Sequence, residues 1–182
     1  DIMLRLNRKG SFYEDSLLVS PACELLASAS DKPAPIADAT RRAVKTALET
    51  RAPTLSDFYR NPDGSVHIDV AAPVFNTTEQ PGAAFVLRCA AADFLYPLIQ
   101  SWPVPSTSAE TLLVRKENDE VVFLNKLRHQ GHTAMTLRIP VTRTEVPAVQ
   151  AILGKQGVVS GLDYRGIHVL ADIRPIPSSD WF

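Results

Sequence analysis

One order of elements occurs twice in this chain of 182 residues, and the repetition constrains the fold more than any other feature of the sequence. The segment Ala-Val-Lys-Thr-Ala-Leu at residues 43–48 leads to a Tyr-Arg pair at residues 59–60, and the similar segment Ala-Val-Gln-Ala-Ile-Leu at residues 148–153 leads to a second pair at residues 164–165. A turn and a β-patterned run with one histidine and one proline follow each pair. A repeated order of this kind indicates two similar modules in tandem.

Apolar alternation and turn signals place the elements of the first module. The expected elements are a hairpin at residues 16–28, a helix at residues 39–50 capped by Asp38, a hairpin of residues 55–60 and 66–74 around a turn at residues 61–64, and a last strand at residues 83–90. We expect these strands to form one five-stranded antiparallel sheet. Pro97 limits residues 93–102 to a short or kinked helix, and residues 102–106 are the expected boundary between the modules.

The second module has the same expected order but stops one strand short. Its expected elements are a hairpin of residues 111–114 and 120–124, a loop at residues 125–137, a helix from Thr144 or Glu145 through Leu153, and a final hairpin of residues 158–163 and 167–176. The sequence therefore predicts an α+β chain of two tandem modules, each an antiparallel sheet of about five strands flanked by helices. We expect residues 1–10 to end an N-terminal helix, residues 11–102 to form the first module, and residues 103–182 to form the second.

Composition excludes several classes of protein. Apolar residues make up 45% of the chain and charged residues 21%, as in ordinary globular domains. The net charge of −1 gives no field that would attract nucleic acid, and no apolar stretch approaches the ~20 residues of a membrane-spanning helix. We expect no nucleic-acid partner, and membrane contact only through segments outside this sequence. Cys23 and Cys89 have neither metal-binding nor redox spacing, so two thiols or one bridge between them are both open.

No catalytic machinery is visible in the sequence. His67 and Asp69 are spaced like a metal-binding or acid–base pair, but no third ligand follows at a recognisable distance. A Gly-x-Ser-x-Gly motif is absent, and residues 154–157 lack the spacing of a phosphate-binding loop. We therefore expect neither enzymatic activity nor a metal or cofactor in this part of the protein.

Four stretches carry a more specific likeness. Residues 64–74, 94–103, 162–171 and 174–177 resemble those of double Cache domains, which are PAS-like extracytoplasmic sensor regions of bacterial transmembrane histidine kinases, diguanylate cyclases and chemoreceptors. The resemblance implies that the first module is membrane-distal and binds a small ligand, and that the second is membrane-proximal and couples it to a cytoplasmic output domain. It also implies a periplasmic location in an inner-membrane protein that dimerises through the N-terminal helix.

Arg88 decides which ligand the resemblance favours. Amino-acid-binding members of the family carry a Gly-x-x-x-x-Asp motif on the fifth strand. In this chain, which resembles them, Gly82 is followed by Arg88 near the position of that aspartate. A guanidinium group binds a carboxylate through two parallel hydrogen bonds and cannot accept from an amine. The difference favours an anionic ligand such as a small carboxylate. The alternative is that Arg88 pairs with Asp69 or Asp57 across the sheet.

Three further residues complete the candidate site. Tyr59 matches an aromatic position in the family, where its phenol donates to the ligand, and a buried tyrosine of the core is the alternative. His67 and Asp69 share one face of their strand, which is either the pocket floor or the solvated outer face. The candidate ligand-binding residues are Asp57, Tyr59, His67, Asp69 and Arg88.

These observations leave two functions in contention. The first is a sensor domain in which a small, carboxylate-type ligand shifts the population between two packings of the first module. The second is a periplasmic protein-interaction module without a small-molecule ligand. An open pocket lined by Tyr59 and Arg88 would favour the first, and a pocket filled by the chain's own side chains would favour the second. An enzyme of unrecognised type comes third.

Overall fold

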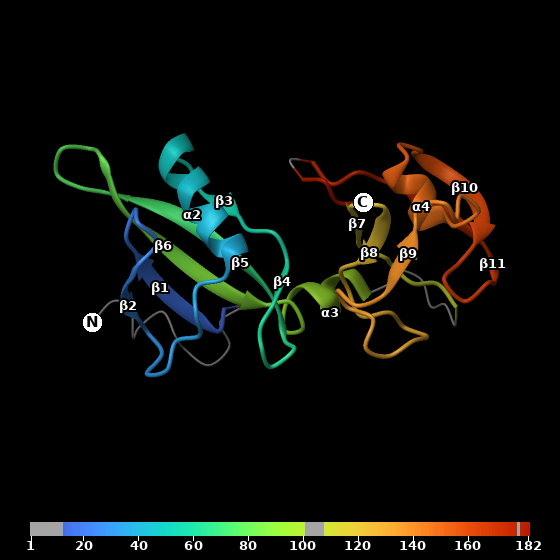
Figure 1. Ribbon diagram of the computed structural model, residues 1–182, viewed down its shortest axis with the longest axis horizontal. Helices are drawn as coiled ribbons and strands as arrows, with labels where there is room; N and C mark the ends of the chain where they lie inside the picture. The colour runs from blue at the N-terminus through green and yellow to red at the C-terminus, as the bar shows by residue number, and fades with distance from the viewer. Residues whose placement is uncertain (1–12, 101–107, 178) are drawn as a thin grey trace. The chain divides into compact units, whose positions relative to one another are not determined.

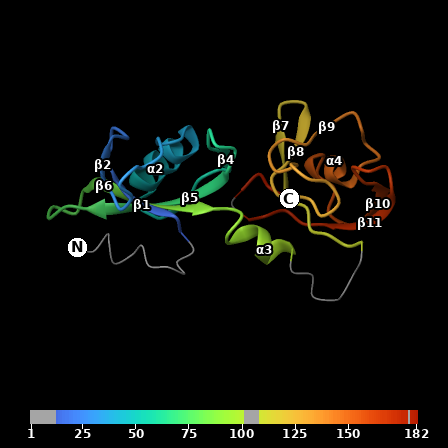
Figure 2. The same ribbon diagram turned by 90° about the horizontal axis from the view of Figure 1, so that it is seen from below.

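The computed structural model describes residues 13–100, 108–177 and 179–182 and divides the chain into two compact units, Asp1–Leu98 and Ile99–Phe182 (Figures 1 and 2). The helix end expected at residues 1–10 and the boundary expected at residues 102–106 lie outside the described residues.

The first unit is built on one antiparallel sheet. Its elements are β1 (Asp15–Val19), β2 (Leu25–Ser28), α2 (Asp38–Thr50), β3 (Thr54–Leu55), β4 (Tyr59–Arg60), β5 (Val66–Phe75) and β6 (Pro81–Ala90), and α3 (Leu95–Gln100) follows them. The strand order is β2-β1-β6-β5-β3, and β4 also pairs with β5. The sheet has six strands, not the predicted five, because the predicted strand at residues 55–60 is split. The Ser56 hydroxyl accepts from the backbone N–H of Asp69, which interrupts the backbone ladder at that point.

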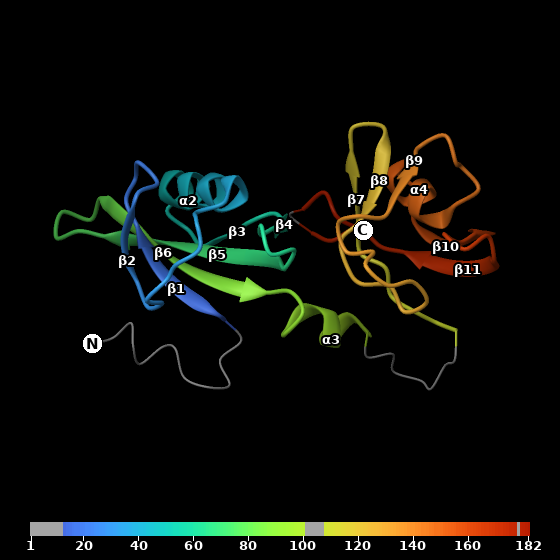
Figure 3. The same cartoon turned by 60° about the horizontal axis from the view of Figure 1, so that its bottom comes forward.

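Helix α2 covers one face of this sheet (Figure 3). Its apolar stripe, which includes Ala43, Val44 and Ala47, packs against Ala71 on β5 and Val86 on β6. Small side chains on both sides allow the helix backbone to approach the sheet closely. The prediction that Asp38 caps this helix is wrong, because the extended residue Ala37 is the N-cap and Asp38 is the first helical residue.

The second unit has two separate sheets among its described residues. Its elements are β7 (Val114–Glu117), β8 (Glu120–Phe123), β9 (Arg138–Pro140), α4 (Pro147–Ile152), β10 (Gly157–Leu162) and β11 (His168–Ile173). The first sheet has the order β7-β8-β9, and β10 pairs only with β11. This differs from the predicted single sheet, because the unpredicted strand β9 takes the edge of β8. Helix α4 contacts both sheets, and it starts later than predicted because the residue before Pro147 is held in an extended conformation.

No helix in the described part of the chain is both long enough and apolar enough to cross a membrane. Cys23 and Cys89 are both free thiols, so the alternative of a bridge between them is not realised.

Candidate functional site

Strand register brings three charged residues into one row across the centre of the first sheet. Asp15 on β1 lies opposite Arg88 on β6, and Arg88 lies opposite Asp69 on β5. Ala71, two residues beyond Asp69 on the same face, belongs to the core beneath α2. The face that carries His67 and Asp69 is therefore the face covered by the helix, and not the solvated outer face.

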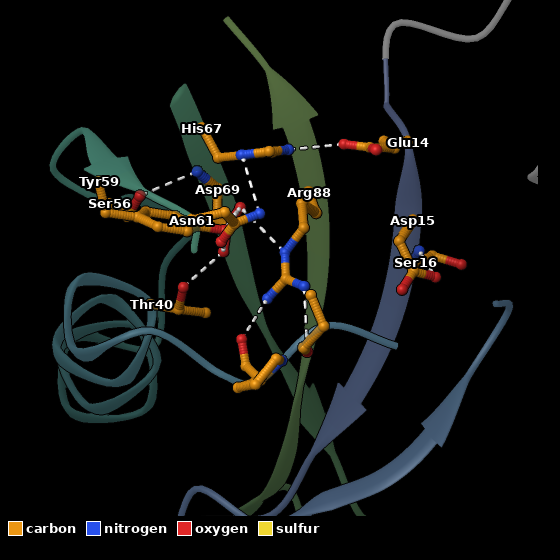
Figure 4. Close-up of polar contacts among 12 residues, drawn as sticks. Glu14, Asp15, Ser16, Thr40, Ser56, Tyr59, Asn61, His67, Asp69 and Arg88 are labelled. Atoms are coloured by element: carbon orange, nitrogen blue, oxygen red, sulfur yellow. Dashed lines mark hydrogen bonds and ion pairs between the residues drawn. The ribbon is translucent and has the colours of Figure 1, made fainter. Parts of the chain in front are cut away.

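Asp69 is the centre of a polar cluster that also contains Thr40, Tyr59, His67 and Arg88 (Figure 4). Its carboxylate is fully buried and accepts from the Thr40 hydroxyl at 2.5 Å and from the Tyr59 hydroxyl, which lies 3.0 Å from both of its oxygens. Burial raises the pKa of Asp69, while the hydrogen bond from Thr40 and the charge of Arg88 oppose that rise. The side chain is thus held from α2, β4 and β6 together.

Tyr59 donates to this carboxylate and cannot easily release its proton. Burial and the neighbouring Asp69 carboxylate raise the pKa of the phenol well above its ordinary value. The ring stacks on His67 with 5.7 Å between the ring centroids. The phenol is therefore a fixed donor. The ring packs in the interior, as expected from the alternative of a buried core tyrosine.

His67 is also buried, and both of its ring nitrogens are engaged. Its Nε2 lies 2.6 Å from a carboxylate oxygen of Glu14, whose side chain is largely exposed. Its Nδ1 lies 3.2 Å from the Asn61 side-chain nitrogen and 3.4 Å from the Ser65 hydroxyl. The imidazole consequently joins the residue before β1 to the turn between β4 and β5.

Arg88 is 2% exposed and is the cation of the cluster. Its Nη1 donates to the carbonyl of Ala34 at 3.2 Å and its Nη2 to the carbonyl of Pro35 at 3.3 Å. Its Nε lies 3.9 Å from Asp69 and has no hydrogen-bond partner. The pairing with Asp69 that the sequence offered as an alternative is thus present. Asp57 lies 3.8 Å from Arg42 instead, and both of those side chains are exposed.

The described residues of each unit line one cavity. One, in the first unit, has a volume of about 420 Å³ and is lined by residues 22–25 and 33–36 and by Arg41. The other, in the second unit, has a volume of about 380 Å³ and is lined by Gln100, residues 109–111 and residues 126–128. Neither cavity is lined by Tyr59 or Arg88, because the polar groups of the cluster contact one another.

Sequence reasoning missed several partners in this site. Thr40 could have been found, because it is a polar residue on the apolar stripe of a predicted helix. Glu14 and the segment that supplies the Ala34 and Pro35 carbonyls carry no comparable signal, since backbone acceptors are independent of side-chain identity.

Comparisons with protein-family profiles and with curated proteins found no match, but solved structures do match. The ligand-binding domain of the Pseudomonas aeruginosa amino acid chemoreceptor PctC, solved with GABA, has a TM-score of 0.60 at 13% identity, over 99% of this chain and 77% of that one. The corresponding domain of PctB with L-Arg has a TM-score of 0.60 at 15% identity, over 97% and 72%. This chain has the fold of a Cache sensor domain.

An extracellular ligand binding receptor from Desulfohalobium retbaense also matches this chain, with a TM-score of 0.57 at 14% identity. The match covers 99% of this chain and 31% of the receptor. This chain thus spans less than a third of the length of that receptor.

Proposed function

We propose that this Cache domain is the extracytoplasmic sensor of a bacterial transmembrane signalling receptor, and that its first unit binds a small solute through a carboxylate. One observation carries the proposal. The buried guanidinium of Arg88 donates through two nitrogens to two successive backbone carbonyls. These two carbonyls accept from the same pair of nitrogens that a carboxylate can engage in a bidentate contact.

A ligand carboxylate would be the better acceptor for these donors. A carboxylate carries a full negative charge, so it attracts a guanidinium more strongly than a backbone carbonyl, which offers only a dipole. The carbonyls of Ala34 and Pro35 are neutral, and the contact of Arg88 with Asp69 at 3.9 Å is an ion pair without a hydrogen bond. Arg88 therefore keeps donors that a carboxylate would satisfy more fully than the backbone does, while Asp69 keeps the guanidinium oriented.

The solved neighbours support a small-molecule ligand of this kind. PctC was solved with GABA, PctB with L-Arg and the Pseudomonas fluorescens chemoreceptor CtaA with L-serine. Each of these molecules carries a carboxylate. Each also carries an amine, so amino acids form the second ligand class to be tested.

In the receptor, the first unit would be membrane-distal and the second membrane-proximal. Ligand binding would favour one packing of the first unit over another and so shift the population between them. The proposed receptor is a homodimer in the inner membrane that passes this shift to a cytoplasmic output domain such as a histidine kinase, a diguanylate cyclase or a chemoreceptor signalling domain. Its sensor carries out no chemical reaction.

One observation favours a second candidate, a periplasmic protein-interaction module. The hydroxyl of Tyr59 and the guanidinium of Arg88 are both engaged by groups of the chain itself, which is the arrangement expected of a filled pocket. In that case a partner protein would supply the signal, and no small solute would stabilise the domain.

A thermal-shift screen tests the proposal. Acetate, butyrate, succinate, L-serine, GABA, simple amines and phosphate are added to the purified chain, because a ligand present at 100 times its Kd stabilises the folded state by about 2.7 kcal/mol. We expect carboxylates to raise the melting temperature. The Arg88→Lys variant keeps the charge but loses the fork, so it should lose the response, whereas Arg60→Lys, at an exposed arginine of β4, should retain it.

A response to amines alone would contradict the role of Arg88. The absence of any response would contradict the small-ligand proposal and leave the protein-interaction module in its place.

A further inference from the structure

The cavity of about 420 Å³ in the first unit shares a wall with the polar cluster. Residues 33–36 line the cavity, and the carbonyls of Ala34 and Pro35 in this same segment accept from Arg88. A carboxylate that replaced these carbonyls on Arg88 would therefore lie beside the segment that borders the cavity.

The wall formed by residues 22–25 is fixed. Cys23 has a left-handed backbone conformation with φ of 62°, and its N–H donates to the Ser20 carbonyl at 2.8 Å. Arg41 on α2 donates from Nη1 to the Cys23 carbonyl at 3.0 Å. The turn between β1 and β2 is thereby tied to the first turns of the helix, and this side of the cavity has little freedom to close.

The wall formed by residues 33–36 is held differently. Pro33 and Pro35 have no N–H to donate. Among the backbone bonds described outside helices and strands, none involves residues 33–36. Among the described residues, the two hydrogen bonds from Arg88 are the polar contacts that hold this segment, and their replacement by a ligand would free it to move.

The lining selects the chemistry of the occupant. Most of it is apolar and comes from Ala22, Leu25, Pro33 and Ile36 together with the buried Cys23. Glu24 and Arg41 also line the cavity, and their charges are opposite in sign. The lining therefore has no net charge that would attract a charged group into the cavity itself. A volume of about 420 Å³ lies within the range of roughly 300–1,000 Å³ usual for small-molecule sites.

We infer that this cavity holds the hydrocarbon part of a small monocarboxylate whose carboxylate takes the place of the Ala34 and Pro35 carbonyls on Arg88. This inference rests on the proposed function and narrows its ligand class. Segment 33–36 is then the part of the first unit that moves on binding, since it gives up its contacts with Arg88 and still borders the ligand.

The test is a titration of the purified chain with acetate, butyrate, hexanoate and succinate, in which binding is measured by calorimetry or by ligand-detected NMR. Each buried methylene contributes about fourfold in affinity, so butyrate should bind roughly fifteenfold more tightly than acetate. Ala22→Leu places extra volume at the cavity wall and should weaken butyrate and hexanoate by about tenfold or more while changing acetate by less than about twofold. Ala52→Leu, at an exposed alanine away from the cavity, is the matched control and should change none of them.

The outcomes separate this inference from the proposed function. Carboxylates that bind through Arg88, with affinity independent of chain length and of Ala22→Leu, would overturn the cavity assignment and leave the sensor proposal standing. Succinate binding more tightly than butyrate would overturn the apolar assignment in the same way. The failure of all four probes to bind would overturn the carboxylate sensor itself.

Discussion

Removal of one hydroxyl group tests whether the polar cluster is organised as described. Tyr59→Phe deletes the donor that lies 3.0 Å from both oxygens of Asp69 and keeps the ring that stacks on His67. Hydrogen bonds to charged groups contribute about 1.5–3 kcal/mol. Because Asp69 retains the Thr40 hydroxyl and the Arg88 charge, we expect a loss near the lower limit, about 1.5 kcal/mol, in the first unit.

Native-state hydrogen exchange measures this loss in the first unit separately from the second. Amides of β5 and β6 should exchange roughly tenfold faster in Tyr59→Phe, since about 1.4 kcal/mol corresponds to a factor of ten.

The pKa of Asp69, already raised by burial, should rise further, because the Tyr59 hydrogen bond acts to lower it. Tyr164→Phe, which removes a phenol bound to Glu110 in the second unit, is the control and should leave β5 and β6 unchanged. A loss below about 0.5 kcal/mol, or equal effects of the two variants on β5, would refute the reasoning.

Two further predictions concern the second unit. A Cβ at Gly161 would lie 2.1 Å from the carbonyl oxygen of Glu145, so Gly161→Ala should destabilise this unit by about 2 kcal/mol or more in urea denaturation, whereas Gly131→Ala, with open space around it, should be nearly neutral. Burial acts to raise the pKa of Asp163, but hydrogen bonds from the Ile167 N–H and from Arg165 outweigh it and lower the pKa below the ordinary 3.8. The charged form therefore stabilises the folded unit above pH 3.8, and this contribution is lost as pH falls through the lower folded pKa. Wild type should be more stable than Asp163→Asn at pH 7, and the difference should shrink between about pH 4 and pH 2; a constant difference would contradict the assignment.

Local patterns in the sequence predicted much of the first unit. The apolar stripe of α2 and the alternation along β5 are each encoded within a single segment. Both patterns correctly predicted which residues of their own element share a face. The short strand β9 could not be predicted in this way, because its three residues include Pro140 and acquire their order only by pairing with β8. The start of α4 was misplaced because a proline at the first helical turn outweighed the capping signal.

The site was predicted as a set of residues but not as a geometry. Alternation correctly placed His67 and Asp69 on one face, yet it could not say which face α2 covers. Asp69 lies opposite Arg88 because of the register between β5 and β6. The irregularity between Val74 and Phe75 shifts this register, and the local sequence pattern does not predict the size of that shift. The partners of Arg88 were unpredictable because they are backbone carbonyls from a segment distant in sequence.

The most direct test of the account is to observe the two carbonyls and the guanidinium of Arg88 together while a carboxylate binds. NMR spectra of the labelled chain would be recorded with and without saturating butyrate, following the carbonyl carbons of Ala34 and Pro35 and the guanidinium nitrogens of Arg88. The account predicts that all of these signals shift together and that the Arg88→Lys variant shows no such change. Butyrate bound at saturation while the Ala34 and Pro35 carbonyl signals remain in place would contradict the claim that a ligand carboxylate replaces them.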